Sequence, residues 1–135
     1  MTNDKRRMTN DKRIAVVGPC AAGKSSLVKR LKAEGYHIRA VSQEHSYAPD
    51  MWRRVSPTDI LIYLDAALET IARRRRISWG QERLDALNHR LRHARAHADF
   101  YLQTDALTFE EVVEQVKQFL DADKAVAPDK KAKNR

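Results

Sequence analysis

The sequence predicts a three-layer α/β domain in which helices flank a parallel sheet of four or five strands. Short apolar runs alternate with longer amphipathic segments along the chain, as strands and helices do in βα units. The first apolar run ends at a glycine-rich turn, and a helical segment follows that turn directly. The length of 135 residues suits one domain of ordinary size.

The expected elements follow one another in a regular order. Strands are expected where apolar and β-branched residues cluster, at residues 14–17, 37–42, 60–64 and 100–103. Helices are expected at residues 24–33, 66–77 and 81–98, and a last one follows Thr108, which forms a capping box with Glu111. Residues 43–59 look irregular, with one helical turn near residues 51–54. The chain is too short for another strand between the first two, so we expect the strand order 2-1-3-4.

Charge divides the chain into a domain and two tails. We expect a disordered basic leader at residues 1–12, a folded domain at residues 13–122 and a disordered basic tail at residues 123–135. The net charge is +8, of which residues 1–13 carry +3, residues 121–135 carry +2 and residues 14–120 carry +3. Basic tails attract polyanions without specificity, so nucleic acid is expected to bind only weakly, through them.

Composition also predicts the compartment. No apolar run approaches the roughly 20 residues of a membrane-spanning helix. The N-terminal residues lack the apolar stretch of a secretory signal. Cys20 is the only cysteine, so an intrachain disulfide is impossible. We therefore expect a cytoplasmic protein that does not bind membranes.

The turn after the first strand fits the phosphate-loop pattern G-x-x-x-x-G-K-[ST]. It consists of Gly18, Pro19, Cys20, Ala21, Ala22, Gly23, Lys24 and Ser25. Backbone amides of such a loop surround phosphate oxygens, and the following helix adds the positive end of its dipole. Lys24 is expected at the β- and γ-phosphates, the Ser25 hydroxyl on Mg²⁺, and the Ser26 hydroxyl at the α-phosphate. The sequence therefore predicts that ATP and Mg²⁺ bind here.

The loop and two later stretches resemble a known group of enzymes. The stretches are DILIYLDAALETIARRRR at residues 59–76 and ARAHADFYLQTDALTFEEVVEQV at residues 94–116. Together with the loop they resemble the small P-loop kinases of metabolites and nucleotides, such as dephospho-coenzyme A kinase, shikimate kinase and cytidylate kinase. The resemblance implies the P-loop NTPase fold. These kinases have a further strand and a longer substrate-binding insertion where this chain has only residues 43–59, so no acceptor site is carried over.

The resemblance also implies roles for residues outside the loop. An arginine ten residues after the end of the strand at 60–64 is Arg74, which would stack on the adenine or reach the phosphates. Arg76 would be a second arginine of the lid helix. The turn at residues 104–106, including Thr104 and Ala106, would line the base.

Two carboxylates are candidates for holding Mg²⁺ or orienting an acceptor hydroxyl. Asp65 directly follows the strand at residues 60–64, and Glu44 follows the second strand. With the strand order 2-1-3-4, Glu44 reaches the carboxyl edge of the sheet beside Ser25. We therefore assign catalysis to Lys24, Glu44 and Arg74 and the metal to Ser25 and Glu44, with Asp65 as the alternative.

Three other features have more than one interpretation. Four consecutive arginines at 73–76 are typical of a solvated helix face, yet guanidinium groups suit phosphate, and we expect at least one to be functional. Trp52 fits a core position and a substrate contact equally well. The histidines of the helix at 81–98 lie opposite its apolar stripe, so we expect them to be exposed and not to bind metal: His89, His93 and His97.

Two functions fit these features. The first is a kinase that transfers the γ-phosphoryl group of ATP to a small metabolite or nucleotide. The second is a nucleotide-binding regulator or switch, an ATPase without a small-molecule acceptor, which the short segment at residues 43–59 favours. The sequence has no N-K-x-D motif, which argues against a common type of GTPase.

Overall fold

The computed structural model describes residues 12–19, 22–54 and 56–126. Its centre is a four-stranded sheet in which all neighbouring strands are parallel. The strand order is β2-β1-β3-β4, which confirms the order 2-1-3-4. The strands are β1 (Arg13–Val17), β2 (His37–Ala40), β3 (Ile60–Asp65) and β4 (Phe100–Gln103).

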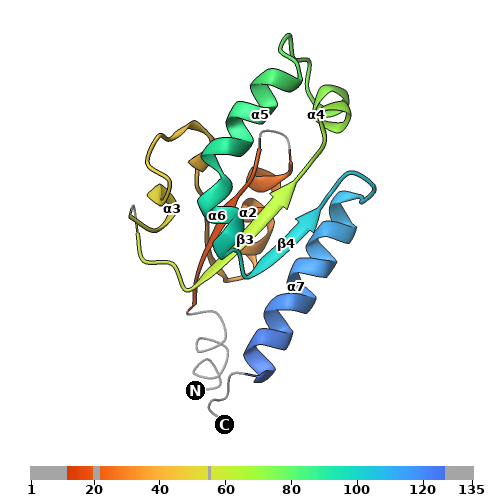
Figure 1. Cartoon of the computed structure of the whole chain (residues 1–135). Coiled ribbons are helices and arrows are strands. Elements are labelled where there is room, and N and C mark those ends of the chain that lie inside the picture. The colour runs from red at the N-terminus through yellow and green to blue at the C-terminus, as the bar shows by residue number, and fades with distance from the viewer. Residues whose placement is uncertain (1–11, 20–21, 55, 127–135) are drawn as a thin grey trace.

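Helices cover both faces of this sheet, an arrangement compatible with the predicted three layers (Figure 1). The long helices α2 (Lys24–Ala33) and α7 (Phe109–Val126) lie against each other and cover one face. The other face is covered by α3 (Met51–Arg54) and α6 (Arg92–His97). On the same side, the short helix η1 (Gln43–His45) packs against α5 (Gln81–Arg90). The remaining helix is α4 (Leu68–Arg74), which follows β3.

The alternation of side chains along β1 explains why the core has two halves. Ile14 and Val16 point into the cluster under α2 and α7, whereas Ala15 and Val17 point into the cluster under α3 and α6. All four are at most 2% exposed, as expected for a central strand of a parallel sheet. Burial on both faces fixes β1 rigidly, and the glycine-rich loop begins where β1 ends.

Several predicted boundaries differ from the structure. The helix expected at 81–98 is two helices, because the Leu91 amide bonds to the carbonyl of Asn88 (3.0 Å) in a tighter turn that closes α5 before α6 begins. The helix expected at 66–77 spans only Leu68–Arg74, and Arg75 is extended with φ −136° and ψ 151°. Helix α7 continues to Val126, four residues into the segment predicted to be disordered. Residues 1–11 and 127–135 lie outside the described residues.

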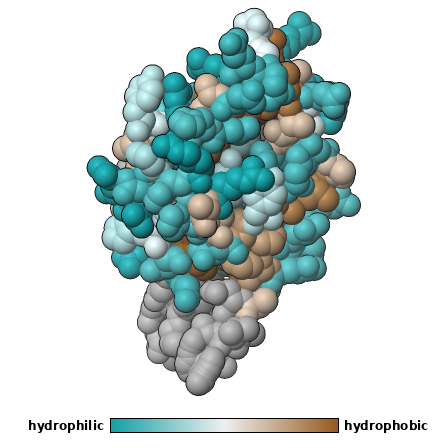
Figure 2. All heavy atoms as spheres, viewed as in Figure 1, coloured by the Kyte–Doolittle hydropathy of each residue, from teal (hydrophilic) through white to brown (hydrophobic). Residues whose placement is uncertain are grey.

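The start of α7 agrees with its predicted cap. The Thr108 amide donates to the Glu111 carboxylate (2.8 Å), and the Glu111 amide donates to the Thr108 hydroxyl (3.1 Å). Among the helices that the structure describes, none is both long and apolar enough to cross a membrane. Hydrophilic residues cover much of the face where α5 and α6 lie (Figure 2).

Candidate functional site

The loop that follows β1 requires glycine at both ends. Gly18 has a φ of 146°, and a Cβ atom there would overlap the backbone carbonyl of Leu64 in β3. Gly23 has a φ of 108° and is the N-cap residue of α2. Glycine adopts both backbone angles without strain. Only Gly18 also allows a close approach to β3, because a Cβ atom at Gly23 would contact nothing within 4 Å. Two predicted loop residues, Cys20 and Ala21, lie outside the described residues.

Lys24 is the first residue of α2, and its side chain folds back over the loop. The ammonium group donates to the carbonyl of Gly18 and lies 3.4 Å from the carbonyl of Pro19. It also forms an ion pair with the Glu44 carboxylate at 2.7 Å. The side chains of Lys24 and Glu44 are 11% and 4% exposed, so little water screens this ion pair.

The strand order places Glu44 beside the loop. The amide of Val41, just after β2, donates to the carbonyl of Val16 in β1 (2.9 Å), which keeps the two strand ends together. The chain then turns into η1, where Gln43 is fully buried. The Gln43 side chain donates to the carbonyl of Ala48 (2.7 Å) and accepts from the amide of Trp52 (2.8 Å). These bonds fix η1, and with it the direction in which Glu44 points.

Arg74 and Thr104 form the opposite wall. The Arg74 guanidinium donates to the hydroxyl of Thr104 (3.1 Å) and to its carbonyl (2.8 Å). Thr104 is 1% exposed, and its hydroxyl in turn donates to the carbonyl of Asp65 (3.1 Å). Arg74 is therefore held against the end of β4, at the turn that the sequence assigned to the base.

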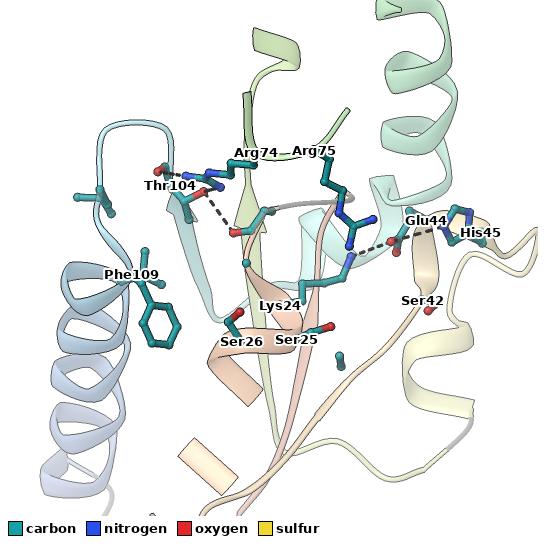
Figure 3. A pocket seen from close by; sticks show the side chains of 15 residues that line it. Lys24, Ser25, Ser26, Ser42, Glu44, His45, Arg74, Arg75, Thr104 and Phe109 are labelled. Atoms are coloured by element: carbon teal, nitrogen blue, oxygen red, sulfur yellow. Dashed lines mark hydrogen bonds and ion pairs between the residues drawn. The ribbon is translucent and has the colours of Figure 1, made fainter. Parts of the chain in front are cut away.

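A cavity of about 540 Å³ lies between these two walls (Figure 3). Its lining includes most of the described site residues that the sequence predicted: Ala22, Gly23, Lys24, Ser25, Ser26, Glu44, Arg74 and Thr104. Ala106 is exposed and is not one of the lining residues, whereas its neighbour Leu107 is. The turn at 104–106 passes the cavity so that Leu107, one position later, faces it.

Sequence reasoning missed seven residues that line the cavity, three of which are Ala40, Ser42 and Val112. The other four are His45 and Arg75, on the side of Glu44, and Leu107 and Phe109, on the side of Thr104. In Figure 3 the guanidinium of Arg75 points toward the Lys24–Glu44 pair. On a helix that continued to residue 77, Arg75 would lie on the apolar stripe with Leu68 and Ile71. Helix α4 instead ends at Arg74, and the extended Arg75 turns toward the cavity.

Asp65 has a different environment from Glu44. Its carboxylate accepts a hydrogen bond from the hydroxyl of Tyr101, accepts another from the amide of Ala66 (2.9 Å) and lies 3.7 Å from the guanidinium of Arg95. Burial of the phenol, and then its hydrogen bond to the Asp65 carboxylate, raise the pKa of Tyr101 to about 12. The structure thus directs Asp65 toward β4 and α6, and Glu44 toward the cavity.

The three histidines do not behave alike. His89 and His97 are exposed as expected, but His93 is half-buried and accepts a hydrogen bond from the indole of Trp52 (3.2 Å). Burial lowers the pKa of His93. The ring of His97 is stacked on that of His93, with 4.1 Å between the ring centres, and lowers this pKa further. Trp52 itself is only 6% exposed and packs in the core. Among the described residues, no group of three potential ligand side chains is placed to hold a metal ion.

No protein-family model matches the chain, and no curated protein matches it. Function is therefore inferred from the residues of the site.

Proposed function

We propose that the chain binds ATP with Mg²⁺ in this cavity and transfers the γ-phosphoryl group to a small metabolite or nucleotide. The observation that carries the proposal is the buried contact between Lys24, at the start of α2, and Glu44, in η1 just after β2. An ammonium group suited to phosphate and a carboxylate therefore line the same cavity.

The charges around the loop suit a triphosphate. The N-cap residue of α2 is Gly23, which has no side chain to occupy the first amides of the helix. The positive end of the helix dipole, the Lys24 ammonium and the Arg75 guanidinium all lie at the cavity, where they would compensate phosphate charge. The Ser25 and Ser26 hydroxyls add donors on the first turn.

The donor chemistry fits Mg²⁺, which prefers oxygen ligands and keeps several waters. The Ser25 hydroxyl and the Glu44 carboxylate both line the cavity and would hold the ion. Bound there, the ion would neutralise the charge of the β- and γ-phosphates. The turn at Thr104, with Leu107 and Phe109 beside it, offers a less polar wall for the base.

The transfer then depends on positioning. When the triphosphate binds, Lys24 exchanges its contacts with Gly18 and Glu44 for contacts with the phosphates. Once Lys24 has turned to the phosphates, the Glu44 carboxylate would either hold Mg²⁺ or orient the acceptor hydroxyl and take its proton, while the acceptor oxygen attacks the γ-phosphorus and ADP leaves. The acceptor must approach from the side of η1, because Glu44 lies there.

The test measures ATP binding with Mg²⁺ by calorimetry in the wild-type protein, in Lys24→Ala and in the control Lys29→Ala. Lys29 is an exposed residue of the same helix, so its loss changes the net charge equally without changing the site. We expect loss of binding in Lys24→Ala only. Equal affinity in all three proteins would refute nucleotide binding at this loop.

A second candidate is a nucleotide-binding regulator or switch that hydrolyses ATP without a small-molecule acceptor. It is favoured by the small size of the region between β2 and β3, whose described residues form η1 and α3 and no further strand, and by the burial of Trp52 there. The two functions differ in how the rate of ADP formation responds to an acceptor. A kinase forms ADP faster when its acceptor is added from metabolite or nucleotide mixtures, whereas the switch forms ADP at a rate that these mixtures do not change.

A further inference from the structure

Positive charge in the folded part of the chain is concentrated between the end of α4 and the end of α6. Residues 73–97, called the arginine segment below, contain eight arginines, one glutamate and one aspartate, a net charge of +6. The other residues between 14 and 120 have a net charge of −3. Four of the eight arginines, at 73–76, lie at the end of α4, where Arg74 and Arg75 line the cavity. Residues 81–97, which form α5 and α6, contain the other four arginines, one glutamate and one aspartate, a net charge of +2.

Two arginines of this segment bond to backbone carbonyls. Arg90 donates to the carbonyl of Glu44 (3.3 Å), and Arg92 donates to the carbonyl of His89 (2.7 Å). A carbonyl orients a guanidinium but does not neutralise it, so these two charges act on the surroundings. Arg95 differs, because it lies 3.7 Å from the Asp65 carboxylate.

Two exposed tyrosines are stacked with arginines of this segment. Tyr47 is 87% exposed, and the guanidinium of Arg90 lies 4.7 Å from its ring centre. A groove of about 310 Å³ beside Tyr47 is also lined by His89, Arg90 and Arg92. Tyr101 is 40% exposed, and Arg95 lies 4.8 Å from its ring centre.

The two stacked pairs belong to the same side of the sheet. The ring of Tyr101 is stacked on that of Tyr63, with 5.5 Å between the ring centres, and Tyr63 packs in the core cluster under α3 and α6. Tyr47 follows η1, which packs against α5. Hydrophilic residues dominate this face in Figure 2, where α5 and α6 of Figure 1 lie. Arg90 is stacked on Tyr47 and Arg95 on Tyr101, so arginines and exposed aromatic rings occur together on this side of the sheet.

We propose that the face formed by α5, α6 and Tyr47 binds single-stranded nucleic acid. Its arginines follow the phosphates, and the rings of Tyr47 and Tyr101 provide flat surfaces on which unpaired bases stack. Exposed stacking surfaces distinguish this ligand from an acidic protein or an anionic membrane, neither of which has bases to stack. The proposal does not depend on phosphoryl transfer at the cavity.

The first experiment measures how charge on this face affects the affinity of the full chain for a fluorescent oligothymidylate of about 20 nucleotides. Arg83→Ala combined with Arg92→Ala is compared with Lys29→Ala combined with Lys32→Ala on the opposite face. All four side chains are exposed, both double variants lose two charges, and both keep the tails.

We expect the arginine variant to bind about tenfold more weakly at 0.15 M salt, with a salt dependence of log Kd that is shallower by about 1.4. The lysine variant should bind like the wild type. Equal losses in both variants would refute the proposal, because they would show that net charge or the tails dominate binding.

The second experiment separates base stacking from charge. Tyr47→Ala should weaken oligothymidylate binding by about tenfold, Tyr47→Phe should restore it, and heparin binding should stay unchanged in both. A parallel loss for heparin and oligothymidylate would refute the proposal. So would binding to phosphatidylserine vesicles that depends on Arg83 and Arg92 in a protein that does not bind oligothymidylate.

Discussion

Glu44 lies in η1, just after β2, and Asp65 is the last residue of β3, so the two carboxylates belong to strand ends on either side of β1. Their side chains nevertheless have different partners. Glu44 pairs with Lys24 and lines the cavity. Asp65 bonds to Tyr101 and lies near Arg95, on the side of β4 and α6. A carboxylate at the carboxyl edge of a parallel sheet is thus only a candidate for function. Its neighbours decide whether its charge is available to a ligand in the cavity.

The largest expected effect comes from removing the partner of Glu44. Lys24→Ala should weaken ATP binding by at least about a hundredfold, because charged hydrogen bonds to two phosphates are lost. It also leaves the carboxylate of Glu44, 4% exposed, without its lysine, so the protein should lose stability as well. Calorimetry and thermal denaturation measure the two effects. Full ATP affinity in this variant would show that the Lys24–Glu44 contact is purely structural.

The second prediction compares the two carboxylates directly. Glu44→Gln keeps the shape of the side chain, so ATP binding should be nearly unchanged while phosphoryl transfer or hydrolysis falls by about a hundredfold. Asp65→Asn should change turnover by less than about threefold, because its carboxylate faces Tyr101 and Arg95. ADP formation under saturating ATP measures both. The reverse ranking would make Asp65 the functional carboxylate.

A third prediction concerns the wall that Arg74 shares with Thr104. Arg74→Ala removes two hydrogen bonds to Thr104 and a positive charge at the cavity, so ATP affinity or turnover should fall by about tenfold. The neighbouring Arg73 is exposed, and Arg73→Ala should have almost no effect. Small and equal changes in both variants would identify the arginine run as a solvated surface.

The strand order and the position of Glu44 could be predicted because each follows from a strong constraint. Residues 43–59, between the second and third strands, look too short to supply a further strand between the first two, so β2 was expected to pair with β1. The capping box of Thr108 and Glu111 was predictable because both partners lie three residues apart. Constraints that act within a short segment are visible in a single sequence.

Features that depend on distant partners could not be predicted in this way. His93 is half-buried because Trp52, 41 residues earlier, donates a hydrogen bond to it. Arg75 faces the cavity because α4 ends one residue before it, and the arginine run gives no sign of that end. Leu107 lines the cavity in place of Ala106 because of the path of the turn after β4.

The smallest expected effect concerns the hydrogen bond that holds Asp65. Tyr101→Phe removes the hydroxyl and keeps the ring, so at neutral pH the free energy of unfolding should fall by about 1 kcal/mol, while turnover stays unchanged. The pKa of Tyr101 is raised from 10.0 to about 12 in the fold, so its contribution is fully present below pH 10 and is lost as the pH rises through 12. The difference in stability between the wild type and Tyr101→Phe should therefore shrink over that pH interval, as denaturant titrations at several pH values would measure. A difference that stays constant to pH 12 would mean that the hydroxyl is not bonded to the carboxylate, and Asp65 would then be available to the cavity, like Glu44.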